Sequence, residues 1–157
     1  MKIKKTNAMR KLDQAKIKYD VLTYDVDEND LSGVHVAETL GVDVDNVYKT
    51  LVLTDGPDYF VCVLPVAANL DMKKVARCFN VKSVSMLSLN NLLPLTGYVR
   101  GGCSPIGMKK QFPTIFADSV LQKDFILVSA GIRGQQLKLN PQELIKFLNA
   151  ECAEILL

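Results

Sequence analysis

A glycine-rich segment in the middle of the chain, residues 96–107, holds the residue types best suited to chemistry. Four glycines and one proline fall within its twelve residues, Thr-Gly-Tyr-Val-Arg-Gly-Gly-Cys-Ser-Pro-Ile-Gly. Glycine permits positive φ and lets main-chain N–H groups approach a ligand without an intervening Cβ. Such a loop can aim several N–H donors at one oxygen atom, although the same composition is also typical of a wide turn between two strands.

Two side chains could act together with such a loop. Cys103 lies inside it, and a thiol near N–H donors is a candidate nucleophile. It would need a base, and nothing in the sequence brings the single histidine, His35, close to it. Lys49 stands between apolar strand residues, so it either points to solvent or is held to offset charge on a substrate. An oxyanion hole made by loop N–H groups, with Lys49 positioning the substrate, would need no enzyme nucleophile.

The composition narrows the class of protein. With 157 residues, 48% apolar and 23% charged, the chain has the size and make-up of one globular domain, residues 1–157. Its net charge of +2 does not by itself indicate nucleic-acid binding. We expect no signal peptide and no membrane span, and the four cysteines without a C-x-x-C pair predict a cytoplasmic protein with no metal site and no cofactor. Motifs for nucleotide phosphates, dinucleotides and zinc proteases are missing.

The elements that must position these residues follow from local patterns. Helices are predicted after Thr6, after Ser32 up to Gly41, from Asn69 through Phe79, from Ser88 until Pro94, and after Asn140. Strands are predicted over residues 19–24, 47–53, 59–64, 84–86, 114–117, 125–128 and 136–139. Because neighbouring strands recur without helical crossovers, we expect an α+β fold with a mixed, partly closed, barrel-like sheet and helices packed outside.

Two further clusters have an ordinary and a functional interpretation. The acidic residues 25–30 are typical of a solvated loop or of caps for the next helix. Lys73, Lys74 and Arg77 form the densest basic group in the first half of the chain, which is usually a solvated helix face but could also contact phosphates.

Four segments together carry a resemblance to a known family. They are residues 47–51 (Val-Tyr-Lys-Thr-Leu), residues 65–67 (Pro-Val-Ala) with residues 70–76, residues 96–110, and residues 128–134 (Val-Ser-Ala-Gly-Ile-Arg-Gly). In this order, over nearly the whole chain, they resemble the YbaK/EbsC family of free-standing trans-editing enzymes, which are related to the editing domain of prolyl-tRNA synthetase. The branch that the chain is most similar to is that of the Cys-tRNA(Pro) deacylases.

The resemblance implies an activity and a set of site residues. The expected reaction releases cysteine from mischarged Cys-tRNA(Pro), with Cys-tRNA(Cys) as a further candidate substrate, and the substrate's own thiol attacks its ester carbonyl. Lys49 matches the family's essential lysine. Positions that would bind the substrate are Tyr24, Thr50, Gly101, Gly102, Ser104, Pro105, Ser129, Gly131 and Arg133. The expected partners are the 3′ end of tRNA(Pro) and prolyl-tRNA synthetase.

The sequence leaves rivals to this function. Alanine-specific relatives share the G-x-x-x-P pattern of residues 101–105, so Ala-tRNA(Pro) is an alternative substrate. A module that binds tRNA or a synthetase without hydrolysis is a second alternative. Relatives usually have an apolar residue at the position of Cys103, which weakens the case for this thiol as a nucleophile.

Overall fold

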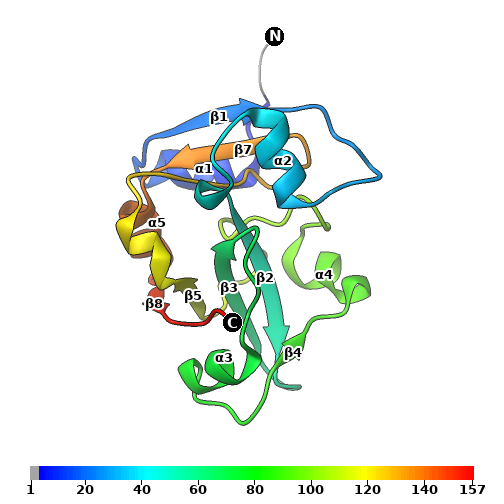
Figure 1. Cartoon of the computed structure of the whole chain (residues 1–157), viewed down its shortest axis with the longest axis vertical. Coiled ribbons are helices and arrows are strands. Elements are labelled where there is room, and N and C mark those ends of the chain that lie inside the picture. The colour runs from blue at the N-terminus through cyan, green and yellow to red at the C-terminus, as the bar shows by residue number, and fades with distance from the viewer. Residues whose placement is uncertain (1–3) are drawn as a thin grey trace.

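The computed structural model describes residues 4–157, and its helices surround two β-sheets (Figure 1). The helices are α1 (Asn7–Gln14), α2 (Gly33–Leu40), α3 (Met72–Cys78), α4 (Leu89–Thr96) and α5 (Pro141–Leu148), with short 3-10 helices η1 (Val44–Asn46) and η2 (Asp118–Gln122). The strands are β1 (Tyr19–Thr23), β2 (Tyr48–Thr54), β3 (Tyr59–Pro65), β4 (Ser85–Met86), β5 (Thr114–Ala117), β6 (Ile126–Ser129), β7 (Gln135–Leu139) and β8 (Glu151–Ala153). The mixed order of elements confirms the predicted α+β class.

The strands form two sheets that meet at one point. An antiparallel three-stranded sheet has the order β1-β7-β6, and a mixed five-stranded sheet has the order β4-β2-β3-β5-β8. A single parallel bridge between Val47 and Leu127 connects them. The prediction of a mixed sheet is confirmed, but the strands do not close into a barrel, because β2 and β6 pair only at this bridge.

The β2–β3 hairpin lies at the centre of the structure (Figure 1). Residues 60–64 of β3 are all buried, as their continuous apolar run predicts. Successive side chains of β2 contribute to opposite faces of the sheet. Tyr48 and Val52 join the larger core with α1 and α5, whereas Leu53 joins a smaller core with α3 and residues near the C-terminus. Because both faces of this hairpin are buried, its register is fixed, and the positions of the β2 residues are fixed with it.

Helix starts with a clear cap lie where the sequence predicts them. The side chains of Thr6, Ser32 and Asn140 each accept a hydrogen bond from a main-chain N–H in the first turn. Helix α2 ends at Gly41 with φ 68°, the left-handed conformation that glycine adopts easily.

Three local predictions need correction. Helix α3 begins after Asp71, whose carboxylate accepts from the N–H groups of Lys73 and Lys74, and not from Asn69. Helix α4 runs through Pro94 to Thr96, although proline removes one main-chain hydrogen bond, and Ser88 makes no capping bond. Strand β8 was not predicted; it pairs in parallel with β5.

Candidate functional site

A cleft opens where the two sheets separate. Beyond the bridge from Val47 to Leu127, β2 and β6 diverge and leave a cleft of about 580 Å³. Val47 and residues 48–52 of β2 form one wall, and Gly101 and its neighbours in the glycine-rich loop form another. The start of α2, the helix α4 and the ends of β6 and β7 complete the lining. The fold therefore brings the two segments that the sequence singles out for chemistry to one cavity.

Lys49 lines this cleft and has no partner for its charge. Its side chain is half-buried, and burial alone lowers the pKa of its ammonium group from the usual value. Within residues 4–157 it makes neither an ion pair nor a side-chain hydrogen bond, and none of the residues lining the cleft is an aspartate or glutamate. A partly desolvated cation without a counter-charge favours the entry of a negative or electron-rich group.

The glycine-rich loop is held by its own hydrogen bonds. The Tyr98 hydroxyl donates to the carbonyl oxygen of Ile106, and burial raises the pKa of Tyr98 to about 12. The hydroxyl of Ser104 is fully buried and accepts from the N–H of Ile106 at 3.3 Å, and Pro105 beside it is also buried. These contacts fix the loop and turn Ser104 and Pro105 away from the cleft, whose lining includes Gly101 and Cys103 instead.

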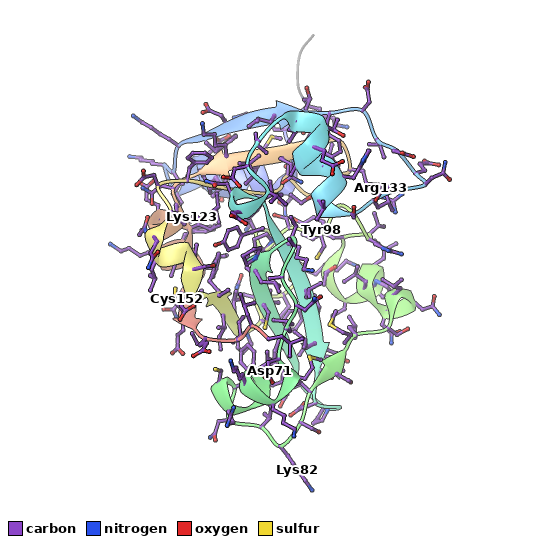
Figure 2. All side chains as sticks on the ribbon, viewed as in Figure 1. Asp71, Lys82, Tyr98, Lys123, Arg133 and Cys152 are labelled. Atoms are coloured by element: carbon purple, nitrogen blue, oxygen red, sulfur yellow. The ribbon has the colours of Figure 1, made fainter. Side chains whose placement is uncertain are left out.

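The second glycine-bearing loop packs against the first. The Nε of Arg133 donates to the carbonyl oxygen of Arg100 at 2.8 Å. A Cβ on Gly102 would lie within 3.3 Å of the main chain of Ile132 and Arg133, so only glycine allows this approach. In Figure 2, Tyr98 and Arg133 lie in the same upper half of the molecule as α2, with Lys82 projecting from the opposite end.

The residues predicted from the family resemblance thus divide into two groups. Four of them line the cleft: Lys49, Thr50, Gly101 and Ser129. The others support it: Gly102 and Arg133 join the two loops, and Ser104, Pro105 and Gly131 pack around the buried Ile106 and Tyr98 rather than line it. Tyr24 lies further along, where its N–H donates to the carbonyl oxygen of Gly134.

Several lining residues were not predicted. The apolar side chains Leu31, Met86, Leu87, Leu89 and Leu92 come from the loop before α2 and from the β4–α4 segment. Gln136 enters from β7, directly opposite Ser129 in the register of β6 and β7. Alternation along β7 places Gln136 on the same side of the strand as the partly exposed Lys138, so the strand pattern alone gives no sign that Gln136 lines a cleft.

Cys103 lines the cleft as a neutral thiol. Burial raises its pKa to about 12. His35 lies beside Asp27 and Asp30, with nitrogen–oxygen distances of 3.9 and 3.8 Å, and makes no hydrogen bond to Cys103. His35 is therefore engaged with these carboxylates and is not placed as a base for Cys103.

The basic cluster on α3 has a structural use at one of its residues. The ammonium of Lys74 donates to Glu154 Oε1 at 2.7 Å and to the carbonyl oxygen of Leu156 at 3.0 Å. This lysine therefore fastens the C-terminal segment to α3. Over residues 4–157, no helix has the length and apolar character needed to cross a membrane.

Comparison with known proteins gives consistent results. Residues 31–147 match the family model described as an aminoacyl-tRNA editing domain. Over 154 residues the chain is 46% identical to an Enterococcus faecalis protein named "Putative Cys-tRNA(Pro)/Cys-tRNA(Cys) deacylase EbsC", which covers 96% of this chain and 93% of that protein.

Two solved structures share the fold. One, described as "a putative trans-editing enzyme for prolyl tRNA synthetase", has a TM-score of 0.84 at 18% identity over 96% of this chain and 95% of its own. The other, hypothetical protein APE2540, has a TM-score of 0.88 at 20% identity over 97% and 100% of the two chains. The family match and the 46% identity confirm the resemblance noted in the sequence: this chain belongs to the aminoacyl-tRNA editing domain family.

Proposed function

We propose that this chain is a trans-editing deacylase that releases cysteine from mischarged Cys-tRNA(Pro), and that residues 1–157 act as a single editing domain. One observation carries the proposal: in a chain 46% identical to a protein named "Putative Cys-tRNA(Pro)/Cys-tRNA(Cys) deacylase EbsC", Lys49 presents to a cleft edged by Gly101 an ammonium that has no partner in residues 4–157. The enzyme needs only to orient the ester and to stabilise the charge that develops on it.

The proposed reaction uses the nucleophile of the substrate. The cysteinyl thiol gives its proton to water, and its sulfur attacks the carbonyl carbon of its own ester. A carbon–sulfur bond forms, and the bond from that carbon to the terminal ribose oxygen breaks. The ribose oxygen takes up a proton and leaves as the free hydroxyl of tRNA. Water then opens the four-membered thiolactone to give cysteine, so water is the only co-reactant.

Lys49 contributes electrostatically to this reaction. A free thiol has a pKa of about 8.5, so a modest downward shift produces useful thiolate at neutral pH. The unopposed Lys49 ammonium supplies such a shift, and it also stabilises negative charge on the ester oxygen in the transition state. The same charge gains a partner when the substrate binds, which offsets the cost of its burial.

Cys103 takes no covalent part in the proposed mechanism. A thiol with a pKa of about 12 is protonated at neutral pH and is a poor nucleophile. We assign direct contact with the aminoacyl end to Thr50, Gly101 and Ser129, which line the cleft. The supporting residues Tyr24, Gly102, Ser104, Pro105, Gly131 and Arg133 would act by holding the two loops in place.

The proposed activity also suggests where the protein acts and which partner delivers its substrate. We place the protein in the cytoplasm, where charged tRNA is used, and propose that prolyl-tRNA synthetase delivers the substrate. The small net charge of +2 favours this, since a protein that captures tRNA alone is normally more basic. Adding the synthetase should therefore raise kcat/KM for release of cysteine, with little change in kcat.

A comparison of three substrates tests the function directly. Release of labelled amino acid is measured with cysteinyl-, alanyl- and seryl-tRNA(Pro) at equal concentration. We expect cysteine to be released at least ~10-fold faster than the other two, because only cysteine carries a thiol of suitable pKa. Faster release of alanine would contradict the proposed specificity. Binding of all three without release would show a binding module and contradict the deacylase.

A further inference from the structure

The edge of β2 that faces the cleft is unpaired along its middle. In the β2–β3 pair, Val66 donates its N–H to the carbonyl oxygen of Val47 at 2.9 Å. Bonded residues alternate along an antiparallel pair, so the peptide groups of Thr50 and Val52 point away from β3. The bond from the N–H of Leu87 to the carbonyl oxygen of Val52 agrees with this direction.

No described strand covers the edge at Thr50. Strand β4 pairs with β2 only at Leu53 and Thr54, and β6 touches this edge only at the bridge from Val47 to Leu127. The N–H and C=O of Thr50 therefore face the cleft between these two contacts. An unpaired strand edge presents donors and acceptors ready to bind another extended main chain.

Side-chain oxygens beside this edge also lack partners. Thr50 is 9% exposed and Gln136 is 6% exposed, and both line the cleft. The Thr50 hydroxyl oxygen and the Gln136 amide oxygen are buried without a hydrogen bond to any residue in 4–157. Buried polar atoms are normally paired, so two unpaired acceptors on residues that line the same cleft indicate a ligand that supplies donors.

We infer that the open edge of β2 at Thr50 recognises the α-aminoacyl part of the substrate as if it were one residue of an added strand. The substrate's α-ammonium donates to the carbonyl oxygen of Thr50, and its ester carbonyl accepts from the N–H of Thr50. This is the pair of bonds that two facing residues exchange in an antiparallel sheet. A second ammonium proton is donated to the amide oxygen of Gln136. The inference rests on the proposed deacylase function and assigns Gln136 a role in substrate recognition.

This arrangement separates two tasks in the cleft. The main chain of Thr50 binds the α-ammonium and ester carbonyl groups, which every esterified α-amino acid shares. The rest of the cleft then distinguishes amino acids by their side chains. It also directs the N–H of Thr50 at the oxygen on which charge grows during attack, where a fixed donor lowers the barrier. Among residues 4–157, no carboxylate lines the cleft and its charged lining residues are the cations Lys49 and Arg100, so only neutral oxygens are left to accept from the ammonium group.

The test removes the ammonium group from the substrate and keeps the thiol. Release is measured from cysteinyl-tRNA(Pro) and from its 3-mercaptopropionyl analogue, each divided by its own rate without enzyme. We expect the wild type to accelerate the cysteinyl ester ~10–100-fold more than the analogue, as for loss of a charge-assisted hydrogen bond. Equal acceleration of the two esters would overturn the inference while leaving the deacylase function intact.

Gln136→Met, with Gln135→Met as its matched control, tests the side chain. Gln135 is the adjacent residue of β7, it also has an unpaired amide oxygen, and it does not line the cleft. Gln136→Met should slow release from the cysteinyl ester about 10-fold and leave the analogue unchanged, whereas Gln135→Met should keep the wild-type preference. If Gln136→Met slows both esters equally, the role of Gln136 is structural and its assignment is wrong.

A binding measurement separates this inference from the reaction. The probes are 3′-amide analogues of cysteinyl- and 3-mercaptopropionyl-adenosine, which cannot be cleaved as esters. On adding the amine-bearing probe, we expect the chemical shift of the Thr50 amide proton to change in NMR spectra. The chemical shift of the Leu51 amide proton, which faces β3, should not change. If no ester is cleaved but this pattern of shifts appears, the proposed deacylase function is wrong, while the inferred binding of the aminoacyl group at Thr50 is supported. An unshifted Thr50 amide at saturation overturns the recognition.

Discussion

Two partly buried lysines serve opposite purposes in this fold. Lys74, on α3, is held by Glu154 and by the carbonyl oxygen of Leu156, and the hydrogen bond with Glu154 raises its pKa. Lys49, near the start of β2, has no such partner within residues 4–157, and burial lowers its pKa. The first lysine closes the contact between α3 and the C-terminal segment, and the second lines a cleft.

The difference shows how a charge can be assigned to stability or to function. A paired charge contributes to the folded state, whereas a partly desolvated charge without a partner costs stability and is typically kept for a ligand. The same reasoning applies to β2 itself. Its end at Leu53 and Thr54 is paired with β4, and its middle at Thr50 is open to the cleft.

Alanine variants of the two lysines should separate activity from stability. We expect Lys49→Ala to lower kcat/KM for Cys-tRNA(Pro) release by about 100-fold or more, because it removes the cation from the transition state. Its Tm should not fall. Lys74→Ala should keep the wild-type rate and lower the Tm. The assignment of Lys74 to stability would be contradicted if Lys74→Ala lost activity but kept the wild-type Tm. The assignment of Lys49 to activity would be contradicted if Lys49→Ala kept the wild-type rate.

The charge of Lys49 should lower the stability of the folded protein at neutral pH, and this effect should disappear as pH rises. Because the pKa of Lys49 is lowered in the folded state, its charge opposes folding at neutral pH, and this cost disappears as pH rises from that lowered pKa towards the usual 10.5. Lys49→Met should therefore melt higher than wild type at pH 7, with a gain that shrinks towards pH 10.5. A gain that grew with pH would contradict the assigned burial.

The Lys74–Glu154 ion pair should stop stabilising the folded protein at both very low and very high pH. The pKa of Glu154 is lowered by Lys74, so the stabilisation is present above its usual 4.5 and disappears as pH falls through the lowered value. The pKa of Lys74 is raised, so the contribution persists to 10.5 and is lost at higher pH. The Tm difference between wild type and Lys74→Ala should be largest between these limits. A difference that stayed constant down to pH 2 would contradict the pair.

The smallest effect is expected at Cys103. Cys103→Ala should leave kcat/KM within about 3-fold of wild type, since a protonated thiol in the cleft wall takes no covalent part. The same release assay measures it, with Cys78→Ala at an exposed position as the control. An inactive, folded Cys103→Ala protein would restore the enzyme nucleophile as the mechanism.

Local features of the fold were predictable because their causes are local. The caps at Thr6, Ser32 and Asn140 depend on side chains within one helical turn, and the buried strand β3 follows from an unbroken apolar run. Where two local signals compete, the prediction failed. Asp71 makes two capping bonds and overrides the earlier start at Asn69.

The cleft was only partly predictable because it depends on how distant strands pair. The family resemblance supplied Lys49, Thr50, Gly101 and Ser129, which the structure brings to one cavity. It did not supply Gln136, whose place in the lining follows from the register of β6 and β7. Nor did it show that Ser104 turns into the core, because that depends on its bond to the N–H of Ile106.

The central claim is that the substrate's own thiol cleaves the ester. The most direct measurement compares release from cysteinyl-tRNA(Pro) with release from S-methylcysteinyl-tRNA(Pro), which keeps the α-amino group and nearly the same shape but cannot form a thiolate. Each rate is divided by the rate without protein. We expect acceleration of the cysteinyl ester and almost none of the methylated one. Equal acceleration of both would contradict the mechanism, because water or an enzyme group would then be the nucleophile.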